Sequence, residues 1–184
     1  MSKEGNYLKK ISLVALFAAL TAAGTFIAIP VGPVPIVLQN LFALLSGLVL
    51  GPFLGTASVG LFLLAGILNF PVFSGGTGGI ARLAGPTGGF LAGYLLAAVI
   101  AGIILGRPRE NVKLPLWRII AAVAAGFFVI YIPGVIWLKI RMELDWLRAI
   151  AAGFLPFVGG DVLKGIVAVF ITPRLRRIAA DILG

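Results

Sequence analysis

The fold is decided by the stretch "PTGGFLAGYLLAAVIAGIIL", residues 86–105, which contains no charged side chain. A helix needs about 20 mainly apolar residues to cross the hydrocarbon core of a bilayer. Pro86 suits the first turn of such a helix, because the N–H group that proline lacks would be unpaired there anyway. We therefore predict a membrane-spanning helix that begins at Pro86 and ends at Leu105.

Five further apolar stretches lie on either side of this one, separated by prolines, glycines or charged residues. They cover residues 11–29, 36–50, 53–70, 116–138 and 147–171. We expect an all-α integral membrane protein with six transmembrane helices, folded as a single transmembrane domain over residues 1–184. The second stretch is short, so a re-entrant segment with only four or five spans is the alternative.

The composition of the chain excludes several classes of protein. Of its 184 residues, 60% are hydrophobic and 11% are charged, and the mean hydropathy is +1.13. Soluble domains carry about 25% charged residues, so the main solvent of this chain is lipid. The chain has no cysteine and no histidine, which excludes disulfides, thiolate chemistry and Ser-His-Asp catalysis and removes the commonest metal ligand. We expect no enzyme activity, no cofactor and no metal, and a lipid-modifying transferase is a weak alternative.

The net charge of +9 is distributed like the charge that flanks membrane helices, not like a nucleic-acid-binding face. Three basic clusters fall on one side of a six-span chain: Lys3, Lys9 and Lys10; Arg107, Arg109, Lys113 and Arg118; and Arg174, Arg176 and Arg177. The other side carries Arg82, Lys139, Arg141 and Arg148. The positive-inside rule then places both termini in the cytoplasm and the loop between spans three and four outside.

Two charged residues lie within the last apolar stretch, in "LPFVGGDVLKG", residues 155–165. Asp161 and Lys164 are three positions apart and therefore share one helix face. We expect Pro156, Gly159 and Gly160 to interrupt the helix, so that Asp161 caps its second half. Charges at membrane depth are costly and mark substrate pathways, although a pair that only neutralises itself is the alternative.

The stretch "FSGGTGGIARLAGPTGG", residues 73–89, forms the predicted external loop. Its glycines let backbone groups approach a ligand closely. Arg82 and the amino terminus of the helix at Pro86 together suit an anion such as a carboxylate. The nucleotide-binding pattern G-x-x-x-x-G-K-[ST] is absent from the chain, so energy from ATP would have to come from another subunit. A plain connector is the alternative.

Further polar residues fall on the same predicted side and are candidates for a shared pocket. They are Gln39, Asn40, Asn69, Thr77, Gly78, Thr87 and Tyr131. A ridge of small residues, Ala15, Ala19 and Ala23, follows the first span at four-residue spacing. Such a ridge lets another helix approach closely, either within the chain or in a partner protein, and the spacing favours packing within the chain.

Several of these motifs resemble those of a known family. The glycine loop followed by "FLAGY", the motif "PFVGGDVLK" and the alanine ridge resemble the signatures of BioY, the biotin-specific S-component of energy-coupling factor (ECF) transporters. Gly159 stands where that family usually has proline. The resemblance implies a prokaryotic cell-membrane protein that captures biotin outside the cell. It also implies a transmembrane coupling subunit, docked on the alanine ridge, and two ATPase subunits.

The resemblance also suggests roles for the candidate residues. Asp161 would accept a hydrogen bond from a ureido N–H, and Lys164 would donate to the ureido oxygen or hold Asp161 in place. Arg82 and the loop groups at Thr77 and Gly78 would bind the carboxylate, although the opposite orientation of biotin stays open. A stand-alone, ion-coupled transporter of a small anionic vitamin-like solute is the main alternative, with Asp161 and Lys164 relaying protons.

Overall fold

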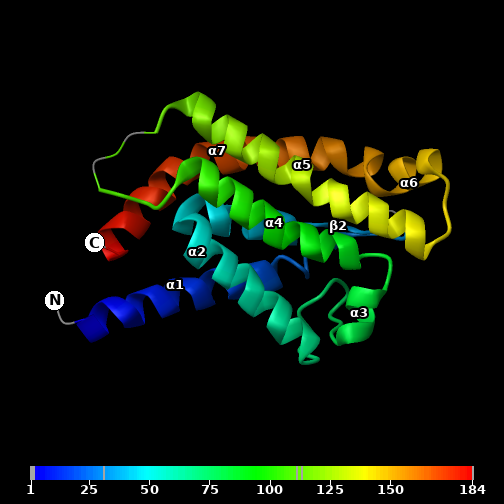
Figure 1. Ribbon diagram of the computed structural model, residues 1–184, viewed down its shortest axis with the longest axis horizontal. Coiled ribbons are helices and arrows are strands. Elements are labelled where there is room, and N and C mark those ends of the chain that lie inside the picture. The colour runs from blue at the N-terminus through cyan, green and yellow to red at the C-terminus, as the bar shows by residue number, and fades with distance from the viewer. Residues whose placement is uncertain (1–2, 31, 111, 113, 184) are drawn as a thin grey trace.

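The structure is a bundle of long helices that lie side by side. The computed structural model describes residues 3–30, 32–110, 112 and 114–183, so Lys113 lies outside the described residues. The elements are α1 (Lys3–Ala23), β1 (Ala28–Ile29), β2 (Ile36–Val37), α2 (Gln39–Ile67), α3 (Ile80–Ala84), α4 (Gly88–Leu105), α5 (Leu116–Arg141), α6 (Trp146–Gly153) and α7 (Leu155–Leu183). Both termini lie at one end of the bundle, and α3 and α6 lie at the other (Figure 1).

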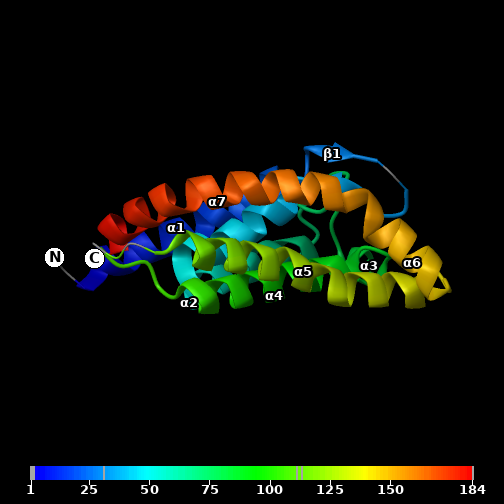
Figure 2. The ribbon, with the colours of Figure 1, turned by 90° about the horizontal axis from the view of Figure 1, so that it is seen from above.

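Five helical segments among the described residues are long and apolar enough to cross a membrane. They are Glu4–Ala23, Gln39–Ile67, Gly88–Leu105, Leu116–Arg141 and Trp146–Leu183, the last of which joins α6 and α7. Helix α4 packs against both α2 and α5, and Ala97, Ala98 and Ala101 on α4 are fully buried. Helix α7 runs along one side of the bundle and α4 with α5 along the other (Figure 2).

Helix α2 consists of two pieces that meet at the predicted break. Gly51 has φ +81° and ψ −175°, a conformation that other residues rarely adopt, and Pro52 follows it. The hydroxyl of Ser46 donates a hydrogen bond of 3.1 Å to the carbonyl of Gly55. In a straight helix these residues would be about 13 Å apart, so the pieces fold back on each other. The first piece, residues 39–50, is about 18 Å long and shorter than the hydrocarbon core.

The predicted end of the first helix and the predicted start of the second are wrong. Helix α1 ends at Ala23, not at residue 29, and Ala28–Ile29 pairs with Ile36–Val37 as a short antiparallel ribbon. Gly24 follows α1 directly and packs so closely on the start of α2 that a Cβ there would meet the backbone nitrogen of Gln39 at 2.8 Å. Prolines at positions 30, 33 and 35 then keep the next segment from forming a helix, because proline fixes φ and lacks the N–H group that a helix needs. The ribbon brings Val37 next to the start of α2.

The predicted start of the helix at Pro86 is also two residues early. Residues 85–88 form a turn in which the N–H of Gly88 donates to the carbonyl of Gly85, and α4 begins at Gly88. The short helix α3, Ile80–Ala84, lies before this turn and was not predicted.

The expected interruption of the last helix lies elsewhere. The break falls at Phe154 (φ −130°, ψ −58°), and α7 continues through Gly159 and Gly160. Pro156 lies in the first turn of α7, where a missing N–H is tolerated, and therefore does not break the helix. Asp161 consequently lies in the second turn and does not cap a helix. Helix α7 also extends beyond residue 171 to Leu183.

Candidate functional site

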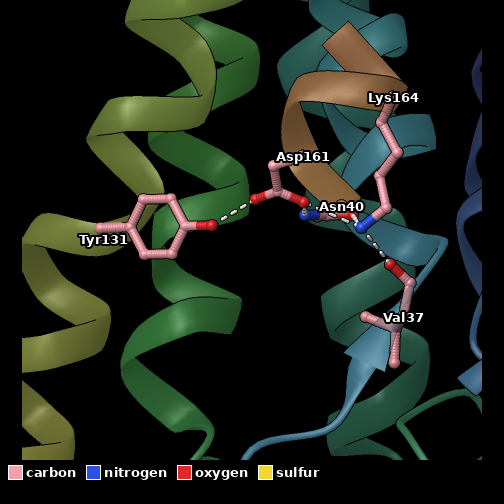
Figure 3. Close-up of polar contacts among 5 residues, drawn as sticks. All are labelled: Val37, Asn40, Tyr131, Asp161 and Lys164. Atoms are coloured by element: carbon pink, nitrogen blue, oxygen red, sulfur yellow. Dashed lines mark hydrogen bonds and ion pairs between the residues drawn. The ribbon is translucent and has the colours of Figure 1, made fainter. Parts of the chain in front are cut away.

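A cluster of polar side chains is buried where α2, α5 and α7 meet (Figure 3). Asp161 and Lys164 lie on one face of α7 and are 7% and 9% exposed. Asn40 comes from the first turn of α2, and Tyr131 comes from α5. The carbonyl group of Val37, in β2, completes the cluster. The proline-rich ribbon and the three long helices thus bring together residues from four parts of the sequence.

The cluster is joined by direct hydrogen bonds. Lys164 Nζ donates to Asp161 Oδ1 at 2.9 Å, to Asn40 Oδ1 at 2.9 Å and to the carbonyl of Val37 at 2.8 Å. Asn40 Nδ2 donates to Asp161 Oδ1 at 2.9 Å. The hydroxyl of Tyr131 donates to Asp161 Oδ2. The ion pair between Lys164 and Asp161 therefore sits inside a shell of neutral partners, which offsets the cost of burying both charges.

The hydrogen-bonding capacity of the cluster is used unevenly. An ammonium group has three donors, and Lys164 uses all three. A carboxylate has about four acceptor positions, and Asp161 uses two at Oδ1 and one at Oδ2. Asp161 therefore retains an acceptor position at Oδ2, whereas Lys164 can bind a further group only by giving up a present partner.

A cavity opens beside the cluster and reaches toward the glycine loop. Its walls come from β2, α2, α4, α5, α7 and the loop segments around Val34 and Phe73. The lining residues are Val34, Pro35, Val37, Gln39, Asn40, Phe73, Ser74, Thr87, Phe90, Leu91, Tyr94, Ile130, Tyr131, Phe157 and Asp161. Most of these side chains are apolar or aromatic, and a few convergent polar groups stand among them, as is typical of small-molecule sites.

Gln39 carries a donor that the protein itself does not satisfy. The side chain is 1% exposed, and its Nε2 finds no hydrogen-bond partner among the described residues. A buried donor without a partner costs about 1–3 kcal/mol. Because Gln39 lines the cavity, this amide is placed to donate to a bound molecule.

Arg82 lies within the hydrogen-bond network of its own loop. Its Nε donates to Thr77 Oγ1 at 2.8 Å, and its Nη2 donates to the carbonyl of Ser74 at 2.7 Å. Thr77 also pairs with Phe73 through two backbone hydrogen bonds. The ring of Phe73 packs edge-on against the ring of Phe62 on α2, with 5.6 Å between the ring centroids. The loop is therefore an ordered turn anchored on α2, and it reaches the cavity through Phe73, Ser74 and Thr87, whereas Arg82 is not among the lining residues.

The other predicted polar residues divide into two groups. Thr87 lines the cavity at the amino-terminal end of α4. Asn69 and Gly78 lie outside the lining residues, where they shape the turn after α2. Asn69 has φ +71°, and a side chain on Gly78 would meet the carbonyl oxygen of Phe70 at 2.3 Å. These two residues position the loop.

The alanine ridge faces outward. Ala15, Ala19 and Ala23 are exposed, whereas Ala18 is buried. The ridge therefore remains open along α1, and packing of the ridge within the chain, which the spacing alone favoured, is not what the structure has.

Sequence reasoning missed most of the cavity wall. Phe90 and Tyr94 on α4, Phe157 on α7 and Phe73 in the loop all line the cavity. The ring of Phe90 packs against the rings of Tyr131 and Phe157, with centroid-to-centroid distances of 6.5 Å and 6.4 Å. The sequence pattern that could have identified them is an aromatic residue at the same membrane depth as Asp161. The apolar stretches contain many phenylalanines, so this pattern does not single out the residues of the cavity wall. Among the described residues, no group of three or more acidic, cysteine or histidine side chains could hold a metal ion.

Comparison with known proteins gives this site its context. The model of the BioY family matches residues 1–181. This chain belongs to the BioY family. The family resemblance inferred from the motifs is therefore confirmed. The family consists of transporters, which agrees with the prediction that the chain is not an enzyme.

Relatives in two organisms and one solved structure extend the match over nearly the whole chain. A probable biotin transporter BioY of Pyrococcus horikoshii is 42% identical, over 91% of this chain and 96% of the relative. The biotin transporter BioY of Thermotoga maritima is 38% identical, over 95% and 99%. A crystal structure of the S-component for biotin from an ECF-type ABC transporter superposes with a TM-score of 0.83 and 31% sequence identity. The match covers 96% of this chain and 95% of that one. The chain is thus an all-α, multi-pass membrane protein with the S-component fold.

Proposed function

We propose that the chain captures biotin as the S-component of an ECF-type ABC transporter. The observation that carries the proposal is the buried cluster of Asp161, Lys164, Asn40 and Tyr131 beside a mostly apolar cavity. Biotin combines a ureido group, an apolar sulfur-containing ring and a carboxylate chain, and the cavity offers matching surfaces for all three. The names of the relatives point to the same ligand.

The ureido group is assigned to the cluster. Asp161 Oδ2 has an acceptor position for a ureido N–H, and the amide of Gln39 is a free donor for the ureido oxygen. Lys164 holds Asp161 in its orientation through the contact with Oδ1. It acts as a positioning residue, because its three donors are already used. Phe90 and Phe157 cover the sulfur-containing ring.

The carboxylate of biotin is assigned to the glycine loop and the start of α4. Arg82 supplies the positive charge of this region, Thr77 accepts a hydrogen bond from it, and Gly78 shapes the loop beside them. Thr87 stands at the amino-terminal end of α4. Arg82 either orders Ser74 at the cavity or exchanges its contact with Ser74 for the carboxylate. The opposite orientation of biotin, with its carboxylate at Lys164, would require Lys164 to release one of its partners.

The chain is proposed to cross the membrane six times, with both termini in the cytoplasm of a prokaryotic cell and the glycine loop outside. The two pieces of α2 supply the second and third crossings. Support comes from the distribution of charge, since the three basic clusters fall in the first half of α1, the α4–α5 connection with the start of α5, and the last part of α7, and these segments lie toward the end of the bundle that carries the termini (Figure 1). The cavity opens toward the opposite end, where an external solute would arrive.

The exposed alanine ridge on α1 is proposed to dock the transmembrane coupling subunit, which in turn binds two ATPase subunits. A leucine at Ala19 would keep a second helix from approaching closely. We expect A19L to bind biotin normally and to lose biotin uptake in cells that contain the coupling subunits. Ala92→Leu, at an exposed position of α4, serves as the control and should transport normally. Equal loss of uptake in both variants would contradict docking at the ridge.

The binding proposal is tested by titrating the purified protein with biotin and with desthiobiotin, which lacks the sulfur-containing ring. We expect one saturable site per chain, with desthiobiotin weaker because it fills less of the aromatic wall. Absence of saturable biotin binding by the folded protein would overturn the proposal.

A stand-alone transporter driven by an ion gradient is the second candidate, because a buried acid on a membrane helix is a feature of proton-coupled carriers. Uptake in a host without coupling subunits separates the two. Concentrative uptake there, abolished by dissipating the ion gradient, would favour the second candidate, whereas uptake that requires the coupling subunits and ATP supports the first.

A further inference from the structure

An apolar groove runs along the outer surface between α5 and α7. The side chains that line it are Leu116, Ile120, Val123, Ala124, Phe127, Phe128, Tyr131, Phe154, Val158, Asp161, Val162, Gly165, Ile166, Val169 and Phe170. Phe128 is 64% exposed and Phe170 is 78% exposed, so the groove faces outward along its length. In a membrane protein this surface meets lipid acyl chains.

A second pocket, lined by basic residues, lies at the end of this groove that faces the termini. It is lined by Arg109, Val112, Leu114, Ile119, Pro173, Arg176 and Arg177. Ile119 follows Leu116 of the groove by one turn of α5, and Pro173 and Arg177 follow Phe170 by one and two turns of α7. The pocket therefore borders the groove, and we call the two together the channel, which has a positively charged end and an apolar body.

The positive charge in this pocket is not paired with a carboxylate of the described residues. Arg176 is buried and donates to carbonyl oxygens, but Arg109 and Arg177 are exposed. In the part of the chain that the structure describes, no carboxylate lies within 4.0 Å of either exposed guanidinium group. Two guanidinium groups beside an apolar channel match a phosphate group that carries an acyl chain.

We propose that this channel binds one anionic phospholipid, with its phosphate between Arg109 and Arg177 and one acyl chain in the groove between α5 and α7. The dimensions agree. One leaflet of the hydrocarbon core is about 15 Å deep, and α5 rises about 16 Å from Leu116 to Phe127. The acyl chain would therefore end before Tyr131 and Asp161, which line both the groove and the substrate cavity.

The test is native mass spectrometry of the purified full chain with phosphatidylglycerol or phosphatidylcholine of identical acyl chains. We expect one phosphatidylglycerol per chain, bound at least about fivefold more tightly than phosphatidylcholine. R109Q/R177Q should abolish the difference, while Arg176 is left unchanged because it is part of the fold. R174Q is the matched control, since Arg174 is exposed on the same helix but does not line the pocket.

A second pair of variants tests the acyl chain. Ala124 and Ala121 are both exposed on α5, but only Ala124 lines the groove. We expect A124F to lower the amount of phosphatidylglycerol that stays bound and A121F to leave that amount unchanged. Inorganic phosphate at millimolar concentration should not displace the lipid.

Three results would overturn the proposal. Equal retention of the two lipids by the wild-type chain would mean that the arginines serve another purpose, such as an acidic protein partner. Equal losses of phosphatidylglycerol binding in R174Q and R109Q/R177Q would mean that the general positive charge of the surface attracts the lipid, and not a specific site. Displacement by inorganic phosphate together with no effect of A124F would mean a site for a free anion and not for a lipid.

Discussion

Helix α7 buries two cations, Lys164 and Arg176, and their surroundings differ. Twelve residues, or about 18 Å along the helix, separate them. Lys164 pairs with a carboxylate beside a cavity, and that carboxylate keeps an unused acceptor position. Arg176, 8% exposed, donates to the carbonyl oxygens of Leu48, Leu105, Gly106 and Arg107.

The difference shows how a buried charge can serve structure or binding. The last four carbonyl groups of a helix have no partner within it. Arg176 satisfies such groups at the ends of α4 and of the first piece of α2, where the negative end of each helix dipole also favours a cation. Its partners are all backbone, so it holds the bundle together. The Lys164 cluster instead presents side chains to a cavity, so it is suited to bind a solute.

The largest effect is expected when Arg176 is replaced by methionine. The carbonyl groups of Leu48 and Leu105 would lose their donor while staying buried. A buried carbonyl oxygen left without a hydrogen-bond donor costs about 1–3 kcal/mol, and more than one would be left in this state. Thermal denaturation in detergent should show this loss, with R174M, at an exposed position of the same helix, close to wild type. A midpoint of unfolding unchanged in R176M would show that these contacts do not hold the bundle together.

Replacing Asp161 by asparagine is expected to have the next largest effect, on biotin affinity. The amide preserves the shape but removes the charge that orients Lys164 and accepts the ureido N–H. Hydrogen bonds to charged groups contribute about 1.5–3 kcal/mol each, so affinity should fall about 100-fold. Isothermal titration measures this, and D181N, at an exposed position near the end of α7, is the control. An unchanged affinity in D161N would remove Asp161 from the binding site.

Tyr131→Phe should have a smaller effect. It removes one hydrogen bond to Asp161 Oδ2 while leaving Lys164 and Asn40 in place. We expect a loss of about tenfold in biotin affinity by the same titration. Y7F, at a residue 67% exposed on α1, should bind as the wild type does. A gain of affinity in Y131F would mean that the tyrosine competes with biotin for the carboxylate.

Arg82→Gln tests the glycine loop and should have the smallest effect. Arg82 is partly exposed and holds Ser74 and Thr77 in place. We expect a loss of about fivefold for biotin and a smaller one for biotin amide, which has no carboxylate, because exposed charges contribute about 1 kcal/mol or less. Titration of both ligands gives the comparison. Equal losses for the two ligands would show that Arg82 only orders the loop.

Local patterns in the sequence predicted much of this molecule. Hydropathy located the long helices, and the spacing of Asp161 and Lys164 placed both on one face of α7. Gly51 and Pro52 predicted the break in α2, because both residues act through their own backbone. Gln39, Asn40 and Tyr131 were found because polar residues are rare in apolar stretches.

The remaining features depend on contacts between distant residues. Arg176 looked like one of several charges that flank a span, and only its hydrogen bond to Leu48, 128 positions away, shows its role. The break at Phe154 has no glycine or proline at that position. Arg82 was expected to face a ligand, but its partners Thr77 and Ser74 lie in a turn whose geometry the sequence does not specify. The outward direction of Ala19 likewise depends on how α1 packs against α2.

One measurement tests the contrast between the two cations directly: the shift of the thermal unfolding midpoint by saturating biotin in wild type, D161N and R176K. Lysine keeps the charge at position 176 but has three donors instead of five. We predict that R176K unfolds at a lower temperature yet shows the wild-type shift, whereas D161N loses most of the shift. A full shift in D161N, or a loss of the shift in R176K, would contradict the assignment of binding to the Lys164 cluster and of stability to Arg176.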